Sequence, residues 1–336
     1  MKKIIICFLS LVTVGCTSYR TIEYNPSSDD MLEEKTIPHS GKISEVWAYL
    51  MAGEEKDFQS GAPITDLCYF SAEINFRGEL RGPSKIPGTL ALPSATRTHL
   101  VVANISNSAL LHFCMDPAFP VRAKLLDDIS TMAESYNGIQ IDFESVHKDD
   151  RIFFMSFLQD LKLKNPGKII SVAIPARTKF ISEDPYDYAI LSRIADRIII
   201  MAYDEHWSGS EAGPVASITW CSGVASYAVS VIPGDKLVMG IPLYGRSWQN
   251  KSYAKSVRYK NAVEMKKNYG RTARTKDKES PSFEYEEAVK VTVYYENISS
   301  IMKKVKLYRD NGVQSVAFWR IGQEPKDLWG YFTDEK

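Results

Sequence analysis

The chain has 336 residues, of which 44% are hydrophobic and 24% charged, a composition typical of a globular protein and not of a disordered or fibrous one. Lysine plus arginine and aspartate plus glutamate each number 41, so no net charge attracts the chain to nucleic acid or another polyanion. We therefore expect a neutral or only locally charged partner.

The first residues have the pattern of a signal peptide, which we place at residues 1–15. Two lysines precede an apolar run that is shorter than the roughly 20 residues of a membrane-spanning helix, and Gly15 stands before Cys16. This junction resembles a bacterial lipoprotein signal, which implies that Cys16 is lipidated. Because residue 17 is Thr rather than Asp, the resemblance implies the outer membrane if the cell has one. The alternative is an ordinary secreted protein.

Residues 16–40 are polar and lack apolar periodicity, so they are interpreted as a lipidated tether. The rest of the chain, residues 41–336, is expected to form one domain. Its three cysteines, Cys68, Cys114 and Cys221, lie in or beside apolar segments and are expected to be buried and free. No CxxC, HExxH or paired-histidine pattern indicates a metal site, and no cofactor is expected.

Short β-branched or aromatic runs recur along this domain, many about 30 residues apart, which is the size of one βα repeat. Helical patterns such as Phe153–Leu163 and Ser299–Tyr308 lie between them. The pattern predicts an α/β fold, a closed (β/α)8 TIM barrel. A doubly wound open sheet is the alternative, but no GxGxxG follows the first strand. The predicted strands are Val46–Leu50, Leu67–Ile74, Leu100–Ile105, Ile139–Phe143, Ile169–Ile174, Arg197–Tyr203, Leu237–Leu243 and Val313–Trp319.

The interval between the seventh and eighth predicted strands is longer than the others. It contains two alternating runs, Phe283–Glu286 and Val289–Tyr295, which are predicted to pair as a hairpin. We interpret this segment as a small insertion in the barrel and not as a separate domain.

The fourth predicted strand ends in acidic side chains and reads IQIDFE over residues 139–144. Because side chains alternate along a strand, Gln140, Asp142 and Glu144 share one face and the apolar residues share the other. The polar face is expected to point into the barrel and rise to its C-terminal mouth, where such barrels keep their active sites. Neighbouring carboxyl groups disfavour each other's ionisation, so Asp142 is expected to help keep Glu144 protonated for acid catalysis.

Residues 137–144 (NGIQIDFE) resemble the DGxDxDxE signature of glycoside hydrolase family 18, the chitinase and endo-N-acetylglucosaminidase barrels. Residues 201–204 (MAYD) resemble the family's MxYD motif on the sixth strand, and residues 240–246 (GIPLYGR) resemble its GxPxYGR motif on the seventh. Trp319 ends the eighth predicted strand, as the family's sugar-floor tryptophan does. The resemblance covers residues 42–332.

Two further segments, residues 204–211 (DEHWSGSE) and 319–324 (WRIGQE), most resemble the spore-cortex and cell-wall N-acetylglucosaminidases of the family. That similarity implies a peptidoglycan substrate in preference to chitin. In its general form, the resemblance implies hydrolysis of a β-linked N-acetylglucosamine glycan, either peptidoglycan or a chito-oligosaccharide.

The resemblance also assigns roles to individual residues. Glu144 is the acid that protonates the leaving oxygen, and Asp142 orients the substrate acetamide. That acetamide attacks the anomeric carbon, so the reaction retains configuration without an enzyme nucleophile. Tyr203 donates to the acetamide oxygen, and Trp319 stacks under the sugar. Weaker candidates for sugar contacts, each with an alternative as an ordinary rim residue, are Tyr49, Met201, Asp204, Trp207 and Arg246.

Two positions depart from the family signature: Asn137 and Gln140 stand where it has aspartates. Gln140 can donate a hydrogen bond to Asp142, but an amide cannot share a titrating proton with it. A non-catalytic sugar-binding lipoprotein on the same barrel is therefore the alternative function, and a structural envelope lipoprotein is a third.

Overall fold

The computed structural model describes residue 41 and residues 43–83, 85–88, 90–249, 252–269, 280–286 and 289–333. The predicted signal peptide, Cys16 and the tether lie outside these residues. Within them, no helix combines the length and apolarity that crossing a membrane requires.

The predicted barrel is confirmed. Neighbouring strands are parallel, and β1 pairs with both β13 and β2, which closes the sheet. A short antiparallel strand, β3 (Leu80–Arg81), is added to the end of β2. The barrel strands are β1 (Glu45–Met51), β2 (Asp66–Ile74), β4 (Arg97–Asn104), β5 (Gly138–Phe143), β6 (Ile169–Pro175), β7 (Arg197–Met201), β8 (Leu237–Pro242) and β13 (Ser315–Trp319).

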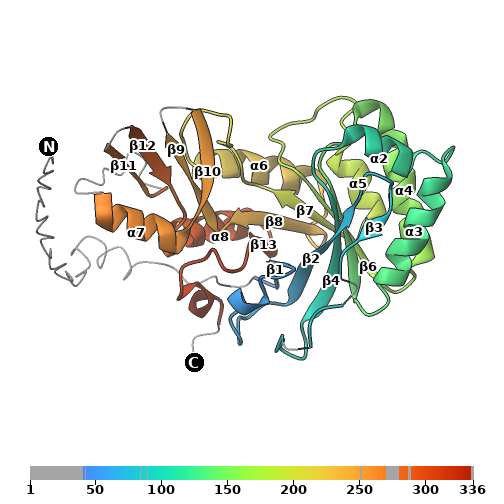
Figure 1. Ribbon diagram of the computed structural model, residues 1–336, viewed down its shortest axis with the longest axis horizontal. Coiled ribbons are helices and arrows are strands. Elements are labelled where there is room, and N and C mark those ends of the chain that lie inside the picture. The colour runs from blue at the N-terminus through green and yellow to red at the C-terminus, as the bar shows by residue number, and fades with distance from the viewer. Residues whose placement is uncertain are drawn as a thin grey trace, which may run out of the picture.

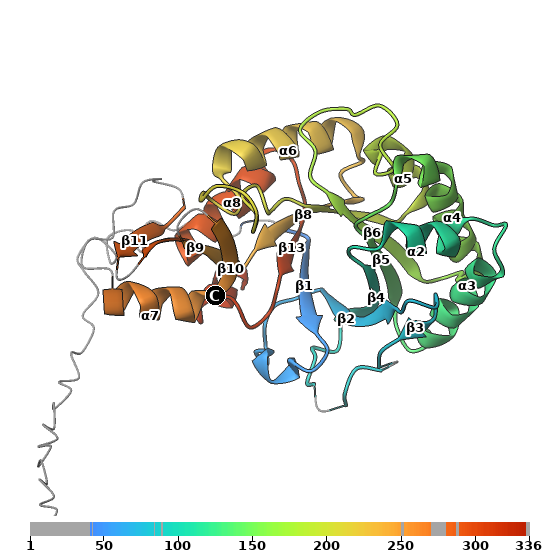
Figure 2. The ribbon, with the colours of Figure 1, turned by 45° about the horizontal axis from the view of Figure 1, so that its top comes forward.

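Helices lie outside these strands, and Figure 2 shows α2 to α5 as an arc around one side of the sheet. The two helices that the sequence predicts correspond to α4 and α8. The helices are α2 (Ser108–Met115), α3 (Pro120–Met132), α4 (Arg151–Lys164), α5 (Tyr188–Ile194), α6 (Ile218–Val231) and α8 (Ile298–Asp310), with 3-10 turns η1 (Glu55–Asp57), η2 (Lys148–Asp150) and η3 (Leu328–Phe332).

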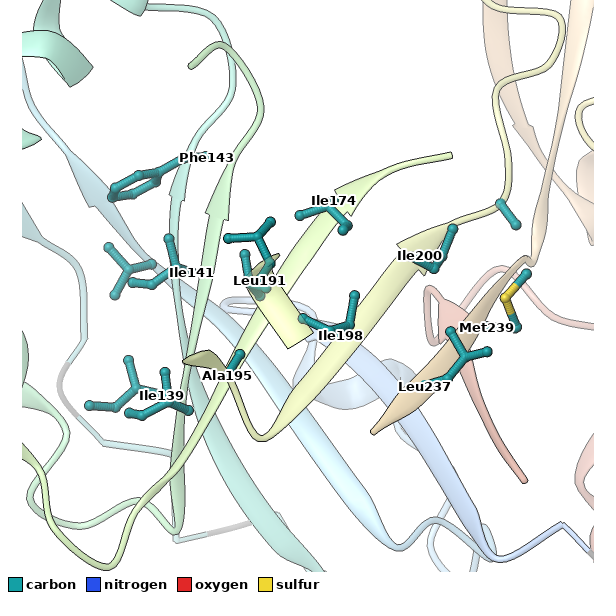
Figure 3. Packing of buried hydrophobic residues seen from close by; sticks show 14 of the residues in the cluster. Ile139, Ile141, Phe143, Ile174, Leu191, Ala195, Ile198, Ile200, Leu237 and Met239 are labelled. Carbon is teal, nitrogen blue, oxygen red and sulfur yellow. The ribbon is translucent and has the colours of Figure 1, made fainter. Parts of the chain in front are cut away.

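Apolar side chains form separate clusters on the two faces of the barrel sheet. The larger cluster lies between strands and helices and includes Ile139, Ile141 and Phe143, which Figure 3 shows one above another along β5. A smaller cluster includes the inward-facing Tyr49 and Cys68. The predicted alternation along β5 is therefore confirmed, and it directs the polar residues of this strand into the barrel. Cys68, Cys114 and Cys221 are buried and free, as predicted.

The segment between β8 and α8 is larger than the predicted hairpin. The expected pair is present as β11 (Ser282–Glu286) and β12 (Lys290–Tyr294), which are antiparallel. They belong to a four-stranded sheet with β9 (Tyr244–Gln249) and β10 (Ser252–Arg258), in the order β10-β9-β12-β11, beside helix α7 (Tyr259–Tyr269). Figure 1 shows this unit beside the barrel, on the side away from α2 to α5.

The N-terminal end of the barrel is closed by an ionic network. Glu45 accepts from Arg97 at 2.7 Å and from Arg197 at 2.8 Å, and the buried Asp66 accepts from Arg97 and His99. Burial opposes ionisation of Glu45, but the hydrogen bonds from the two arginines outweigh it and lower its pKa to about 2. This network lies at the end of the barrel opposite the mouth. Residues at that end of such barrels contribute to the stability of the fold and not to catalysis.

Candidate active site

The end of β5 presents two carboxyl groups at different depths. Asp142 lies inside the barrel with only 3% of its surface exposed, whereas Glu144 follows the strand and is exposed at the mouth. The Glu144 amide donates to the Asn104 carbonyl at 3.0 Å, so this residue still runs alongside β4. The inner carboxyl group is thus shielded from solvent and the outer one is accessible to a ligand.

Both carboxyl groups have raised pKa values, from different causes. Burial raises the pKa of Asp142 well above its usual range, and the charge of Glu144 adds to the effect. The pKa of Glu144 is raised first by partial removal of water and second by the charge of Asp204. The expected coupling between Asp142 and Glu144 is present, because the charge of Glu144 adds to the rise in the pKa of Asp142, and the pKa of Glu144 is raised as predicted. Asp204, which the sequence reasoning did not connect with the acid, supplies a further charge that raises the pKa of Glu144.

Trp319 stands across the mouth from Glu144. The barrel order places β13 four strands from β5 in both directions, so these two strand ends lie on opposite sides. The indole ring of Trp319 meets the rings of Tyr49 and Phe70 edge-on, with centroid distances of 5.1 and 5.2 Å. Phe70, which sequence reasoning missed, and Tyr49 therefore support the half-buried Trp319 as an apolar surface facing the acid.

Tyr203 follows β7, between these two sides of the mouth. Burial raises the pKa of its phenol well above the usual range, and the charge of Asp142 is the next largest cause. Its ring lies against Gly240 of β8, where an added Cβ would be 3.0 Å from the ring and 2.6 Å from the Ile200 carbonyl. Gly240 thus provides the room that lets Tyr203 lie beside Asp142. Met201 packs against the inner cluster below it.

Asp204 is held by two partners from the beginning of the insertion. One carboxylate oxygen accepts from the Tyr244 hydroxyl at 2.5 Å and from an Arg246 guanidinium nitrogen at 2.6 Å. Asp204 also has a positive φ of 61°, which is uncommon for a residue other than glycine. Arg246 is therefore a support for Asp204. Tyr244, which we did not single out although it lies in the YGR segment, has the same role.

Trp207 is exposed on the loop after Asp204, with 56% of its surface accessible. The insertion holds this loop: the Trp248 indole donates to the Ser210 carbonyl at 3.1 Å, and the Ala254 amide donates to the Ser208 carbonyl at 3.0 Å. The four-stranded sheet thus fixes the loop that presents Trp207 at the rim of the mouth.

Gln140 does not have the partner expected from the sequence. Its amide nitrogen donates to Ser171 Oγ at 3.2 Å and lies 3.7 Å from Cys68 Sγ, so it does not donate to Asp142. One carboxyl oxygen of Asp142, Oδ1, is buried with no hydrogen-bond partner. A buried polar atom of this kind is costly unless a partner is supplied, so Asp142 is a candidate to receive a ligand donor.

Asn137 lies outside the mouth. It precedes β5, where its side-chain oxygen accepts from the Thr98 amide at 2.8 Å, and it joins the starts of β4 and β5. Glu144 is seven positions further along, which is roughly 23 Å in an extended strand. The supporting role that we gave Asn137 at the site was therefore wrong, because a motif position says nothing about which end of the barrel it occupies.

A closed (β/α)8 barrel with an exposed acid at the mouth, a buried carboxyl group beside it and an aromatic wall opposite has the features of a glycosidase. The model of the glycosyl hydrolases family 18 matches residues 120–324, and the chain belongs to this family. Membership makes the protein a glycosidase whose substrate contains N-acetylglucosamine.

Individual relatives agree with this assignment. The chain is 28% identical to the putative sporulation-specific glycosylase YdhD of Bacillus subtilis, over 95% of this chain and 74% of the relative. It is 30% identical to the cortical fragment-lytic enzyme of Bacillus anthracis, over 79% and 66% of the two chains. The crystal structure of the spore cortex-lytic enzyme SleL of Bacillus cereus superposes with a TM-score of 0.73 at 28% identity, covering 86% of this chain and 74% of that one.

The charge of Asp204 gives a prediction for the pH profile. A general acid works while protonated, so activity falls as pH rises through its pKa. Replacement Asp204→Asn removes a charge that raises the pKa of Glu144, so the basic limb of kcat/KM should move to lower pH. The exposed Asp149, which lies in η2 beyond β5, serves as a control, and Asp149→Asn should leave the limb in place. An unmoved limb in Asp204→Asn would show that Asp204 does not act on the acid.

Proposed function

We propose that the protein is a retaining, substrate-assisted hydrolase of β-linked N-acetylglucosamine glycans and that its substrate is peptidoglycan. The mechanism is inferred from the surroundings of the two carboxyl groups near Glu144, namely their burial and their binding partners. Asp142 is buried, which raises its pKa and disfavours its charged form, and Asp204 is bound by Tyr244 and Arg246. Neither is suited to attack an anomeric carbon, which favours the substrate's own acetamide as the nucleophile.

In the proposed first step, the acetamide oxygen attacks the anomeric carbon while Glu144 gives its proton to the leaving glycosidic oxygen. The carbon–oxygen bond of the linkage breaks, and a cyclic oxazolinium ion forms. The buried Asp142 Oδ1 accepts from the acetamide N–H, and the Tyr203 hydroxyl donates to the acetamide oxygen. Trp319 supports the sugar ring from the opposite wall, since its indole presents an apolar face.

In the second step, the Glu144 carboxylate takes a proton from water, and the water oxygen bonds to the anomeric carbon. The ring of the oxazolinium ion reopens as the acetamide. Two displacements at one carbon restore the original β configuration. Glu144 returns to its protonated form, so atoms and charge balance over the cycle.

The preference for peptidoglycan rests on the relatives whose names refer to spore-cortex lysis and on the similar segments 204–211 and 319–324. Cleavage after N-acetylglucosamine leaves that sugar at each new reducing end. Borohydride reduction of digested peptidoglycan, followed by acid hydrolysis and mass analysis, should therefore yield glucosaminitol.

Muramitol in that digest would show cleavage at the other linkage. Release of sugar from chito-oligosaccharides with no new ends from peptidoglycan would identify chitin as the substrate class. Either result would contradict the proposed substrate.

A further inference from the structure

The polypeptide around Glu144 is fixed differently on its two sides. On the β4 side, pairing continues to the end of β5, where Phe143 lies opposite Asn104. The Glu144 amide extends this side by donating to the Asn104 carbonyl, and the Ser145 hydroxyl donates to the Ile105 carbonyl at 2.6 Å. Hydrogen bonds to β4 and to the loop after it therefore hold the segment from Phe143 to Ser145, which includes Glu144.

On the β6 side, pairing ends early, at Ile141 opposite Val172. Backbone groups of successive strand residues point to alternate sides, so the Phe143 carbonyl points toward β6, beyond the last paired residue. A buried carbonyl there needs another donor. That donor is the Tyr186 hydroxyl, at 2.7 Å from Phe143 O.

The same hydroxyl accepts from the Val146 amide at 3.0 Å. One phenol oxygen therefore bonds to the backbone on both sides of the Glu144–Ser145 dipeptide. Burial keeps the pKa of Tyr186 well above its usual value, so the hydroxyl keeps its proton and donates at any ordinary assay pH.

Tyr186 is itself held in place. It is 5% exposed, its ring meets Phe154 of α4 edge-on at 6.0 Å, and its amide donates to Asp184 Oδ1 at 3.0 Å. Asp184 in turn is bound by Arg177 at 2.6 Å. The loop between β6 and α5 is therefore organised around a tyrosine whose hydroxyl reaches the neighbouring strand.

We propose that Tyr186 is a positioning residue for the acid: its hydroxyl takes the place of the missing β6 pairing and sets where the Glu144 carboxyl group stands in the mouth. This inference rests on the proposed role of Glu144. The Tyr186 hydroxyl bonds only to the backbone beside Glu144, so it acts through Glu144 and not on the sugar.

Replacement Tyr186→Phe removes the hydroxyl and keeps the ring. We expect kcat to fall about 10- to 100-fold with a much smaller change in KM, because a misplacement of about 1 Å can lower a rate by that factor. A looser segment also exposes Glu144 to water, so the basic limb of the pH profile should move to lower pH. The titratable side chains that interact electrostatically with Glu144 are Asp142, Tyr186, Tyr203 and Asp204.

Tyr188 provides a matched control. It is equally buried, lies two residues further along, and donates its hydroxyl to the Pro175 carbonyl at 2.9 Å, away from the Glu144 segment. Tyr188→Phe therefore loses a comparable backbone hydrogen bond but keeps both bonds from the Tyr186 hydroxyl to the segment around Glu144. We expect both variants to be folded and similarly destabilised, and only Tyr186→Phe to lose kcat. If kcat falls equally in the two folded variants, or if both keep the kcat of the parent, the proposal is overturned.

A second measurement tests the positioning role of Tyr186 independently of whether the protein cleaves a glycan. Carbon-13 NMR titration of labelled glutamate, with Glu144→Gln to assign the resonance, reports the pKa of Glu144 without turnover. It should fall in Tyr186→Phe and stay at the parent value in Tyr188→Phe. An unchanged value in both variants would refute the positioning role even if hydrolysis is observed. Failure of the parent to cleave any glycan would refute the proposed function, while a shift in Tyr186→Phe alone would still support the positioning of Glu144.

Discussion

Glu144→Gln should lower kcat by at least about 10²- to 10⁴-fold while glycan affinity is retained, since general acid catalysis typically contributes that factor. The amide keeps the size of the side chain and removes the proton that the leaving oxygen must receive. Glu144 is the residue of β5 and its extension that is exposed at the mouth, whereas Asp142 is buried. Initial rates and binding isotherms on the same N-acetylglucosamine oligosaccharide give the two quantities.

Glu134 provides the control for this variant. It is exposed after α3, near the start of β5 and thus at the other end of the barrel, so Glu134→Gln should leave kcat unchanged. Turnover by Glu144→Gln at the parent rate would remove Glu144 from the mechanism. Equal binding with no turnover in the parent itself would favour the sugar-binding alternative, for which the amide at Gln140 is the motivating feature.

Lys304→Ala should lower the free energy of unfolding by about 3–5 kcal/mol, as expected when one partner of a buried ion pair is removed. Lys304 and Glu296 are 0% and 2% exposed, and the ammonium group donates to the carboxylate at 2.8 Å. Ser300 Oγ donates to the same carboxylate oxygen at 2.6 Å. Without Lys304, the buried Glu296 carboxylate loses the ammonium group that lies 2.8 Å from it.

Urea unfolding of the parent and of Lys304→Ala measures this difference. Lys306→Ala serves as the control, because Lys306 lies on the same helix in an exposed pair with Asp310, and such pairs contribute roughly 0–1 kcal/mol. Comparable losses in the two variants would show that the buried pair has no special contribution.

Apolar runs predicted the barrel strands well, because strands that are buried on both faces are largely apolar. The start of β4 was predicted three residues late and the start of β13 two residues early, and the largest error at the C-terminal end of a strand was at β7, which was expected to continue to Tyr203 but ends at Met201. There the Ala202 and Tyr203 amides bond back to the Ile200 and Met201 carbonyls, and the chain turns into the positive φ of Asp204. That turn places Asp204 near Glu144, and no periodicity indicates it.

The insertion was only partly predictable. Its β11–β12 hairpin is local and alternating, whereas β9 pairs with β12 across more than forty residues and β10 is a mixed polar strand. Local patterns do not encode such a distant pairing.

Within the site, motif similarity identified Glu144, Asp142, Tyr203 and Trp319, which the fold brings around one mouth. It did not predict the partner of Gln140 or the charge that acts on Glu144, since both depend on side-chain directions in three dimensions. Tyr186 carries no sequence signal at all. Its role follows only from the point where the β5–β6 pairing ends.

The most direct test of the central claim is proton NMR of the first product released from a β-linked N-acetylglucosamine oligosaccharide, recorded before mutarotation. Substrate-assisted cleavage by Glu144 predicts the β-anomer at the new reducing end. The α-anomer as the first product, or equally fast cleavage of a substrate that lacks the 2-acetamido group, would contradict it.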